Sequence, residues 1–396
     1  MSTKRMIVLL SLIALAMSAV LITGCGSGDG GTKEPIKIGV VLSESGSNQP
    51  LGAPEKKAIE LFEERINESG GIGGHDVEVI IKDDASDASK AQQAAVELIE
   101  QEDVVALIGS SGTGPTISMK QEATKNEIPQ VCMAAGANIM DGDFTWIFRT
   151  PPTATEAGRK VLAYIEKVLN LKRIALLYDT NPFGTDGKAV IEGNAGEYGL
   201  QVVASEGYKT DESESGMDTH LTNVQTSNPD LVLVWGTNPG PAIIAKRMKD
   251  KGMSQPYIGS HGIANQSFIK LAGDAANGVV FPGGKLLIYK EVLDPSSAEY
   301  KAIDEFATAY MDRYGEKVDT FAGHGWDAML IITEALKRAG ADATRSELRD
   351  AIEETQGVVG SAGIFNYTAS DHNGLTPDDL VMVDIANGQW EPGQQP

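Results

Sequence analysis

Five histidines and one Gly-rich loop are the residues of this sequence best suited to binding chemistry. His261 stands in "YIGSHGIAN", just after a short apolar run and inside a loop bracketed by glycines. None of the histidines has the i,i+4 or Cys-x-x-Cys spacing that is typical of zinc ligands, so we expect no metal site. His261 therefore stays a candidate either for hydrogen bonding to a ligand or for packing. The five are His75, His220, His261, His324 and His372.

The loop "GSSGTG", residues 109–114, follows an apolar run and precedes an expected helix. It lacks the Gly-Lys-Ser/Thr ending of a nucleotide P-loop, and it does not match the Gly-x-Ser-x-Gly pattern of a hydrolase. A helix N-terminus presents free N–H groups and a partial positive charge. We expect anion binding here, with the hydroxyls of Ser110, Ser111 and Thr113 nearby. A tight turn with an N-cap is the alternative.

The remaining reactive side chains form no catalytic motif. Asp83 and Asp84 follow an expected strand, where acidic residues commonly make turn and cap hydrogen bonds. Cys132 has no His or Lys close to it in the sequence and is expected to be a small core residue. We therefore expect neither an enzyme nor a cofactor, and an active site would need residues that only folding brings together.

Length and charge narrow the class of protein. The chain has 396 residues, which predicts two domains rather than one core. Its 55 acidic and 33 basic residues give a formal net charge of −22. Such a field repels phosphate backbones, so nucleic acid is not an expected partner.

The N-terminus is typical of an exported lipoprotein. Lys4 and Arg5 precede an apolar run over residues 6–22, which is short for a permanent membrane span. The run ends in "ITGC", which resembles a bacterial lipobox, so we expect a signal peptide over residues 1–24 and lipidation of Cys25. The Gly-rich residues 25–35 would be a flexible tether. An uncleaved signal anchor is the alternative.

Beyond the tether, short apolar runs alternate with amphipathic ones, which predicts parallel sheets covered by helices. The pattern runs through a first α/β unit, restarts after "FRTPPT" (148–153), and changes to long helices from Ser297. The expected helices cover residues 54–68, 89–100, 115–125, 156–168, 187–198, 241–251, 297–314, 322–338 and 344–354.

Several motifs in this order resemble the type I periplasmic solute-binding proteins, in the Leu/Ile/Val-binding branch that serves ABC importers. They are "IKIGVVLSESGSNQPLG", "INESGGIGGHDVEVIIKDDASDASKA", "VVALIGSSGTG", "FRTPPT", "RIALLYDTNPFGTDG" and "FAGHGWDA". The resemblance implies an α/β fold of two doubly wound parallel-sheet lobes, joined by three hinge crossovers near Thr153, Pro282 and Gly360, with a ligand cleft between them. The N-terminal lobe would hold residues 36–153 and 283–360, and the C-terminal lobe residues 154–282 and 361–390.

The resemblance also implies site residues. Thr113 falls where amino-acid binders hold the ligand carboxylate, and Ala134 where a backbone carbonyl contacts ligand. His261 falls where the family has a Glu that pairs with the ligand ammonium. Four further positions depart from the pattern: Gly136 replaces a Thr, Ala154 an acidic residue, Phe183 a Tyr and Thr237 an aromatic residue. We expect Leu51, Phe183 and Trp235 to supply an apolar wall.

The expected function is that of an extracytoplasmic solute-binding lipoprotein of an ABC importer, at the cell surface or in the periplasm. Its ligand would be a small, partly apolar carboxylate, such as an aromatic or branched keto or hydroxy acid. The expected partners are permease subunits, and the protein is expected to be a monomer. A receptor for branched-chain amino acids and a sensing module for a membrane signalling protein are the alternatives.

Overall fold

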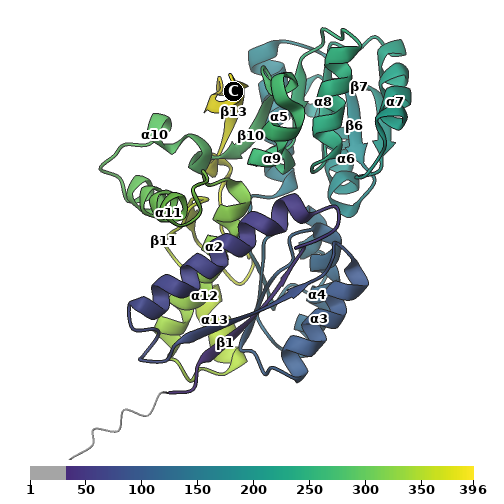
Figure 1. Cartoon of the computed structure of the whole chain (residues 1–396). Coiled ribbons are helices and arrows are strands. Elements are labelled where there is room, and N and C mark those ends of the chain that lie inside the picture. The colour runs from purple at the N-terminus through teal and green to yellow at the C-terminus, as the bar shows by residue number, and fades with distance from the viewer. Residues whose placement is uncertain (1–32) are drawn as a thin grey trace, which may run out of the picture. The chain divides into compact units, whose positions relative to one another are not determined.

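The computed structural model describes residues 33–396, and residues 35–396 form one unit built around two sheets (Figure 1). The expected signal peptide, the Cys25 lipidation site and most of the tether lie outside the described residues. In the part that is described, no helix has both the length and the apolar character needed to span a membrane.

The first sheet has five parallel strands in the order β2-β1-β3-β4-β5. Successive residues of a strand point to opposite faces, and apolar residues on both faces of β1 bury the sheet from two sides. We call this sheet and the helices packed on it the first lobe. The strands are β1 (Ile36–Leu42), β2 (Val77–Asp83), β3 (Ala106–Gly109), β4 (Gln130–Cys132) and β5 (Ile147–Arg149).

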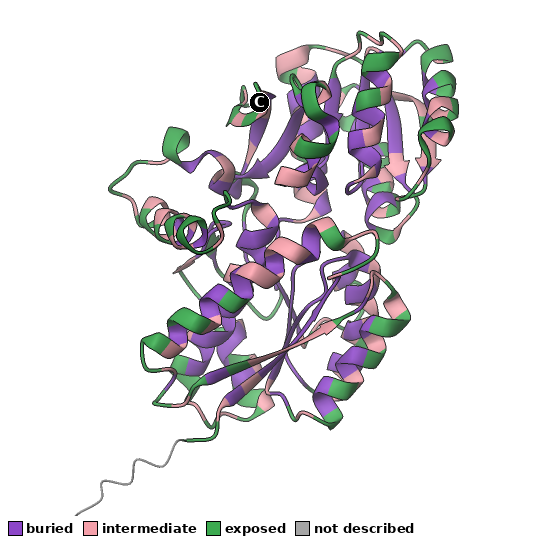
Figure 2. Ribbon diagram, in the orientation of Figure 1, coloured by how far each residue is buried: buried purple, intermediate pink, exposed green. Residues whose placement is uncertain are grey.

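Helices cover both faces of this sheet. One face packs on α2 (Gln49–Glu68), α12 (Thr320–Ala339) and α13 (Arg345–Glu353). The other face packs on α3 (Ala88–Glu100) and α4 (Thr113–Lys125). Figure 2 shows the central strands buried and the outer faces of the helices exposed, and the edge strand β2 is mostly of intermediate burial.

The second sheet has seven strands in the order β14-β13-β10-β9-β8-β6-β7. Its five strands from β7 to β10 are parallel, and β13 and β14 extend it as antiparallel strands. The strands are β6 (Arg173–Asp179), β7 (Gln201–Tyr208), β8 (Leu231–Trp235), β9 (Tyr257–Gly259), β10 (Val280–Gly284), β13 (Leu380–Ala386) and β14 (Gln389–Pro392).

This sheet is also covered on both faces, and with its helices it forms what we call the second lobe. One face packs on α5 (Ala154–Tyr164) and α6 (Pro182–Asn194). The other packs on α7 (Glu214–Thr226), α8 (Gly240–Asp250) and α9 (Gln266–Ala272). The α/β class with two doubly wound lobes, expected from the sequence, is confirmed.

A smaller cluster joins the long helices to the first lobe. The short helix α10 (Tyr289–Val292) and α11 (Ala298–Tyr314) pack with α2 through buried residues that include Leu61 and Phe306. Trp326 of α12 stacks on Phe306, with ring centroids 4.6 Å apart. The long helices expected after Ser297 therefore pack against the first lobe.

The chain passes between the two sheets three times. The first passage follows β5, and the second follows β10. The third comes after Leu375, later than the Gly360 position expected from the sequence. The reason is the small hairpin of β11 (Val358–Val359) and β12 (Ile364–Phe365), which directs Tyr367 back into the core of the first lobe. There the Tyr367 hydroxyl donates to the Arg149 carbonyl at 2.8 Å.

Candidate ligand-binding site

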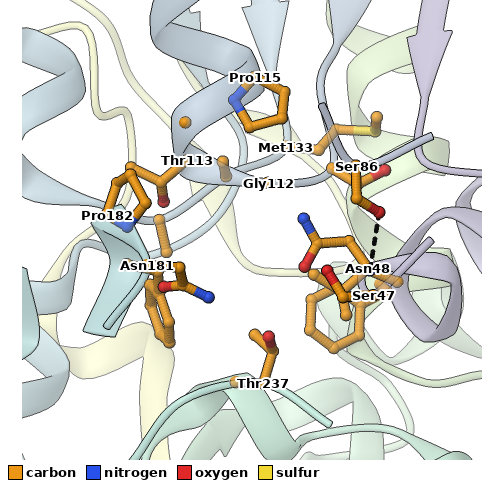
Figure 3. A pocket seen from close by; sticks show the side chains of 18 of the residues that line it. Ser47, Asn48, Ser86, Gly112, Thr113, Pro115, Met133, Asn181, Pro182 and Thr237 are labelled. Atoms are coloured by element: carbon orange, nitrogen blue, oxygen red, sulfur yellow. Dashed lines mark hydrogen bonds between the residues drawn. The ribbon is translucent and has the colours of Figure 1, made fainter. Parts of the chain in front are cut away.

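A cavity of about 110 Å³ lies where the carboxyl ends of strands from both lobes face each other (Figure 3). This is the usual position of a ligand in open α/β sheets. First-lobe residues after each of the strands β1 to β5 line it, together with two residues of α12. Second-lobe residues after β6, β7, β8 and β9 complete it. The lining includes Ser47, Asn48, Leu51, Ser111–Pro115, Met133–Ala135, Asn181–Phe183, Thr210, Thr237, His261, Gly262, Phe321 and His324.

The N-terminus of α4 forms one end of the cavity. Gly112 is the N-cap residue and has no side chain that could accept a hydrogen bond. The N–H groups of Thr113 and Gly114 therefore have no acceptor among the described residues. Free N–H groups at the positive end of a helix dipole suit an anion. Asn48 also lies at this turn, because a Cβ at Gly112 would come within 2.4 Å of its Nδ2 atom. The N-terminus of α4 therefore offers free N–H donors to the cavity, and anion binding there stays a prediction.

Gly136 makes room for Thr113. A Cβ at Gly136 would lie 2.4 Å from Thr113 Cγ2 and 2.9 Å from its Oγ1. Only a residue without a side chain leaves Thr113 where it lines the cavity. Gly136 itself does not line the cavity, so its contribution to a ligand would be this close approach rather than a contact.

The two serines before the helix have structural partners. The Ser110 hydroxyl donates to Asp84, and the Ser111 hydroxyl donates to Glu55. Burial raises the pKa of Asp84, and raises the pKa of Glu55 well above its usual value. Ser110 lies behind the loop and does not line the cavity, whereas Ser111 does.

Aromatic residues of the second lobe form an apolar wall. Phe183 lines the cavity at the start of α6, where Asn181 accepts from the Gly184 N–H at 2.9 Å and Pro182 takes the first helical position. Trp235 is fully buried behind it, with the two ring centroids 6.1 Å apart. Trp235 therefore supports the wall without lining the cavity.

His261 stands against this wall, inside the cavity. Its ring centroid lies 5.2 Å from Phe183 and 5.7 Å from Trp235, and both contacts are edge-on. Neither ring nitrogen has a hydrogen-bond partner among the described residues. Burial, and then the charge of Arg149, lowers the pKa of His261 to about 3, so the imidazole is neutral near pH 7.

A second histidine, His324, lines the cavity and was not expected from the sequence. His324, on α12 of the first lobe, is 3% exposed, and its Nδ1 atom has no partner within the described part of the chain. Burial, and then the proximity of His261, lowers its pKa to about 3 as well. A signal was available in "FAGHGWDA": Phe321 and His324, three residues apart at the start of a helix, share one helix face.

Other polar and charged groups lie around these two histidines. Thr237 Oγ1 is buried in the lining without a partner in residues 33–396. Arg149 is fully buried behind the cavity, where it donates to the carbonyls of Ala135 and Gly136 at 2.9 and 2.8 Å. It forms no ion pair with a described residue. Among the residues described, the lining includes no Asp, Glu, Lys or Arg.

Hydrogen bonds join the two lobes. The Ala137 N–H of the first lobe donates to Asp186 of α6 at 2.7 Å. Near the start of α12, the Thr320 N–H donates to the Ala264 carbonyl at 3.3 Å. The lobes are thus joined by hydrogen bonds from two separate segments of the first lobe.

Other sites that the sequence could have held are absent from the described residues. Residues 33–396 contain no group of three or more His, Cys, Asp or Glu that could hold a metal ion. Cys132 is buried, and burial raises the pKa of its thiol. A buried thiol with a raised pKa is poorly suited to nucleophilic chemistry.

Comparison with known proteins agrees with this geometry. Residues 35–389 match the model of the family described as periplasmic binding protein. The chain is 24% identical over 380 residues to the Leu/Ile/Val-binding protein homolog 1 of Brucella abortus (strain 2308), covering 96% of this chain and 95% of the relative. It is 25% identical over 283 residues to the Leu/Ile/Val-binding protein of Escherichia coli (strain K12), covering 71% and 73% of the two chains.

Solved structures show the same fold. An extracellular ligand-binding receptor from Rhodopseudomonas palustris HaA2 superposes with a TM-score of 0.85 at 25% identity, covering 91% of this chain and all of that one. The branched-chain amino acid transporter substrate binding protein LivJ of Streptococcus pneumoniae, solved with isoleucine, gives a TM-score of 0.81 at 24% identity, covering 90% and 98%. The chain therefore belongs to the periplasmic binding protein family, which consists of solute receptors rather than enzymes, in the branch whose curated relatives are named Leu/Ile/Val-binding proteins.

Proposed function

We propose that this protein is an extracytoplasmic, lipid-anchored receptor that delivers a small, partly apolar carboxylate to the permease of an ABC importer. The favoured ligands are aromatic or branched keto and hydroxy acids. The observation that carries the proposal is the lining of the cavity: within residues 33–396 it combines a free helix N-terminus with two neutral histidines and includes no charged side chain.

The α4 end supports a carboxylate. Thr113 and Gly114 offer N–H groups, and the Thr113 hydroxyl adds a donor that can rotate toward a bound oxygen. The buried charge of Arg149 lies behind the neighbouring Ala135 and Gly136 carbonyls. A positive charge without a paired carboxylate favours an anion in the cavity.

The histidine end disfavours an ammonium group. The lowered pKa of His261 means that its surroundings resist a positive charge at this position, through burial and the field of Arg149. An ammonium group bound at the same place would meet the same burial and the same field. Burying a charged group without an ionised partner costs more than the few kcal/mol that an unpaired polar group costs.

The contacts between lobes support capture by closure. The cavity takes its lining from both lobes, and few residues connect them, which suits a hinge motion. Closure would surround the ligand with Leu51 from one side and Phe183 from the other. We propose that one monomer closes on one ligand.

Import of branched-chain amino acids is the second candidate, because the curated relatives are named Leu/Ile/Val-binding proteins. In that case the Ala134 carbonyl, Thr237 and the neutral histidines would have to accept hydrogen bonds from the ligand ammonium. No carboxylate of residues 33–396 lines the cavity to balance its charge.

The test is a ligand panel measured by calorimetry on the purified full-length protein. It pairs leucine, valine and phenylalanine with their keto and hydroxy acids, and adds benzoate. We expect the keto or hydroxy acid to bind at least ~10-fold more tightly than its amino acid, a difference of about 1.4 kcal/mol. Small-angle scattering with the best ligand should show compaction. Tighter binding of leucine or valine would favour the second candidate, and no compaction would count against closure.

The lipid anchor is tested by Cys25→Ala. We expect the variant to be released from the membrane fraction, because a lipoprotein is held by acyl chains attached to this residue. Fractionation followed by immunoblotting measures the change. Cys132→Ala is the matched control, since Cys132 is buried in the first lobe. A Cys25→Ala protein that stays in the membrane while wild type is processed normally would contradict the anchor.

A further inference from the structure

Two histidines from opposite lobes line the same cavity. His324 comes from α12 of the first lobe, and His261 from the loop after β9 of the second. Both are more than nine-tenths buried, at 3% and 8% exposed. Three of their four ring nitrogens are fully buried without a partner in the described chain: His324 Nδ1, His261 Nδ1 and His261 Nε2.

We propose that His324 is a specificity-determining residue that acts with His261 to bind an uncharged hydroxyl group close to the ligand carboxylate. The preferred solute is then a 2-hydroxy acid with a branched or aromatic side chain. This inference rests on the proposed function, because it assumes that the carboxylate binds at the N-terminus of α4.

The hydrogen-bonding capacity of the pair selects a hydroxyl. A neutral imidazole has one N–H donor and one acceptor nitrogen, so two of them offer two donors and two acceptors. A hydroxyl both donates and accepts, and it can satisfy one group of each kind. A keto oxygen only accepts, which leaves both acceptor nitrogens unpaired. An ammonium group only donates, and it brings a charge that no lining residue in 33–396 balances.

One turn of the second lobe contacts both ends of the cavity. A Cβ at Gly114, in the first turn of α4, would lie 3.3 Å from Pro182 Cγ. The next residue, Phe183, has its ring centroid 5.2 Å from that of His261. The Pro182–Phe183 turn therefore borders both the N-terminus of α4 and His261, and the proposal places the hydroxyl near the carboxylate on this basis.

A small chamber behind the histidines does not offer an alternative ligand site. His261 and His324 line it together with Thr320 and Ser361, and its volume is about 10 Å³. That is room for about one water molecule. A ligand can reach the pair only from the larger cavity.

His372 shows how a histidine with a packing role differs in this fold. Its Nδ1 atom lies 2.7 Å from the Ile147 carbonyl, and its ring stacks on Phe148 with centroids 4.2 Å apart. His324 has a single ring contact, with Phe321 at 5.9 Å, and no hydrogen bond from its ring is found within residues 33–396. Its polar capacity is thus unused until a ligand binds.

The test uses two series of acids, and within each series the compounds differ only at the carbon next to the carboxylate. The branched series is 2-hydroxy-4-methylpentanoate, 4-methyl-2-oxopentanoate, 4-methylpentanoate and leucine. The aromatic series is mandelate, phenylglyoxylate, phenylacetate and phenylglycine. Calorimetry on the full-length protein should rank the hydroxy acid first in at least one series. We expect it to bind ~10-fold more tightly than the acid that lacks the hydroxyl, as a single well-placed hydrogen bond allows.

Three variants identify His324 as the cause. His324→Phe keeps a flat ring but has no nitrogen to bond the ligand hydroxyl. It should reduce the preference for the hydroxy acid to less than about threefold, because the hydroxyl then loses one hydrogen-bond partner. His324→Gln keeps a donor and an acceptor and should retain part of the preference. His220→Gln removes a histidine next to Glu206, away from the cavity, and should leave the preference unchanged. Thermal unfolding checks that each variant is folded.

The outcomes separate this inference from the proposed function. Hydroxy acids that bind no better than their deoxy analogues would overturn the inference alone. The same holds if His324→Phe is folded and keeps the full preference, or if His324→Phe does not fold and His324→Gln shows no loss. Tightest binding of the amino acids, or no binding in either series, would overturn both.

Discussion

Replacing His261 by glutamate is expected to reverse the ligand preference. The variant places a carboxylate where the structure has a neutral imidazole, so the ammonium of leucine gains an ionised acceptor. The same carboxylate repels a second anion in the cavity. We expect leucine to bind at least ~100-fold more tightly than to wild type, corresponding to roughly 3 kcal/mol, and the keto and hydroxy acids to bind more weakly.

His261→Gln is the matched control, because glutamine has nearly the shape of glutamate without its charge. Calorimetry with leucine and 2-hydroxy-4-methylpentanoate on both variants separates loss of the imidazole from gain of a charge. Equal leucine affinities in the glutamate and glutamine variants would show that residue 261 does not face the ammonium position. The proposed role of His261 in selecting against amino acids would then be wrong.

The alternation of the sequence was sufficient to predict the sheets and most of their helices. Helices α7 and α9 were not expected, and several other errors lie where Gly and Pro weaken the pattern. β10 reads "VFPGG" and was not recognised as a strand, although its residues are all buried. Proline is favoured at the first position of a helix, so Pro54 was the expected start. Helix α2 instead begins at Gln49, and Pro54 lies inside it. Helix α6 begins at Pro182, five residues before the expected start at Gly187.

The candidate site was only partly predictable, because long-range contacts decide which loop residues line a cavity. Of the expected ligand residues, Leu51, Ser111, Thr113, Ala134, Phe183, Thr237 and His261 line it. Ser110, Gly136 and Trp235 lie behind the lining. Local sequence does not show that Asp84 accepts from Ser110, since the two are 26 residues apart. That any of these residues binds a ligand stays a prediction.

The same limit explains why His324 was missed. Apart from Phe321, the other cavity residues lie far from it along the chain, and it stands on a helix whose buried face is mostly apolar. A histidine on such a face is commonly a core residue, and the spacing of Phe321 and His324 does not by itself distinguish a ligand contact from core packing. Its position becomes informative only once α12 is placed beside the loop that carries His261.

The buried histidine pair should also make the unfolding free energy depend on pH. Burial lowers the pKa of both residues from 6.5 to about 3. Below pH 6.5 the unfolded chain binds protons at these positions and the folded chain does not, so their contribution to stability is complete above 6.5 and is lost as the pH falls toward 3. Buried Asp319 and Asp327, with pKa values raised to about 6 and about 7, act in the opposite direction, so wild type alone does not isolate the effect.

A comparison of wild type with His261→Gln/His324→Gln isolates it. Each histidine contributes about 1.4 kcal/mol per pH unit, so two histidines over the two units from pH 6.5 to 4.5 change the difference in unfolding free energy by about 5 kcal/mol. Wild type should lose this stability relative to the double variant as the pH falls. Urea unfolding followed by tryptophan fluorescence at each pH measures the difference, and each single variant should account for about half. Parallel curves for wild type and the double variant would mean that the histidines titrate freely in the folded protein, which contradicts a buried neutral pair.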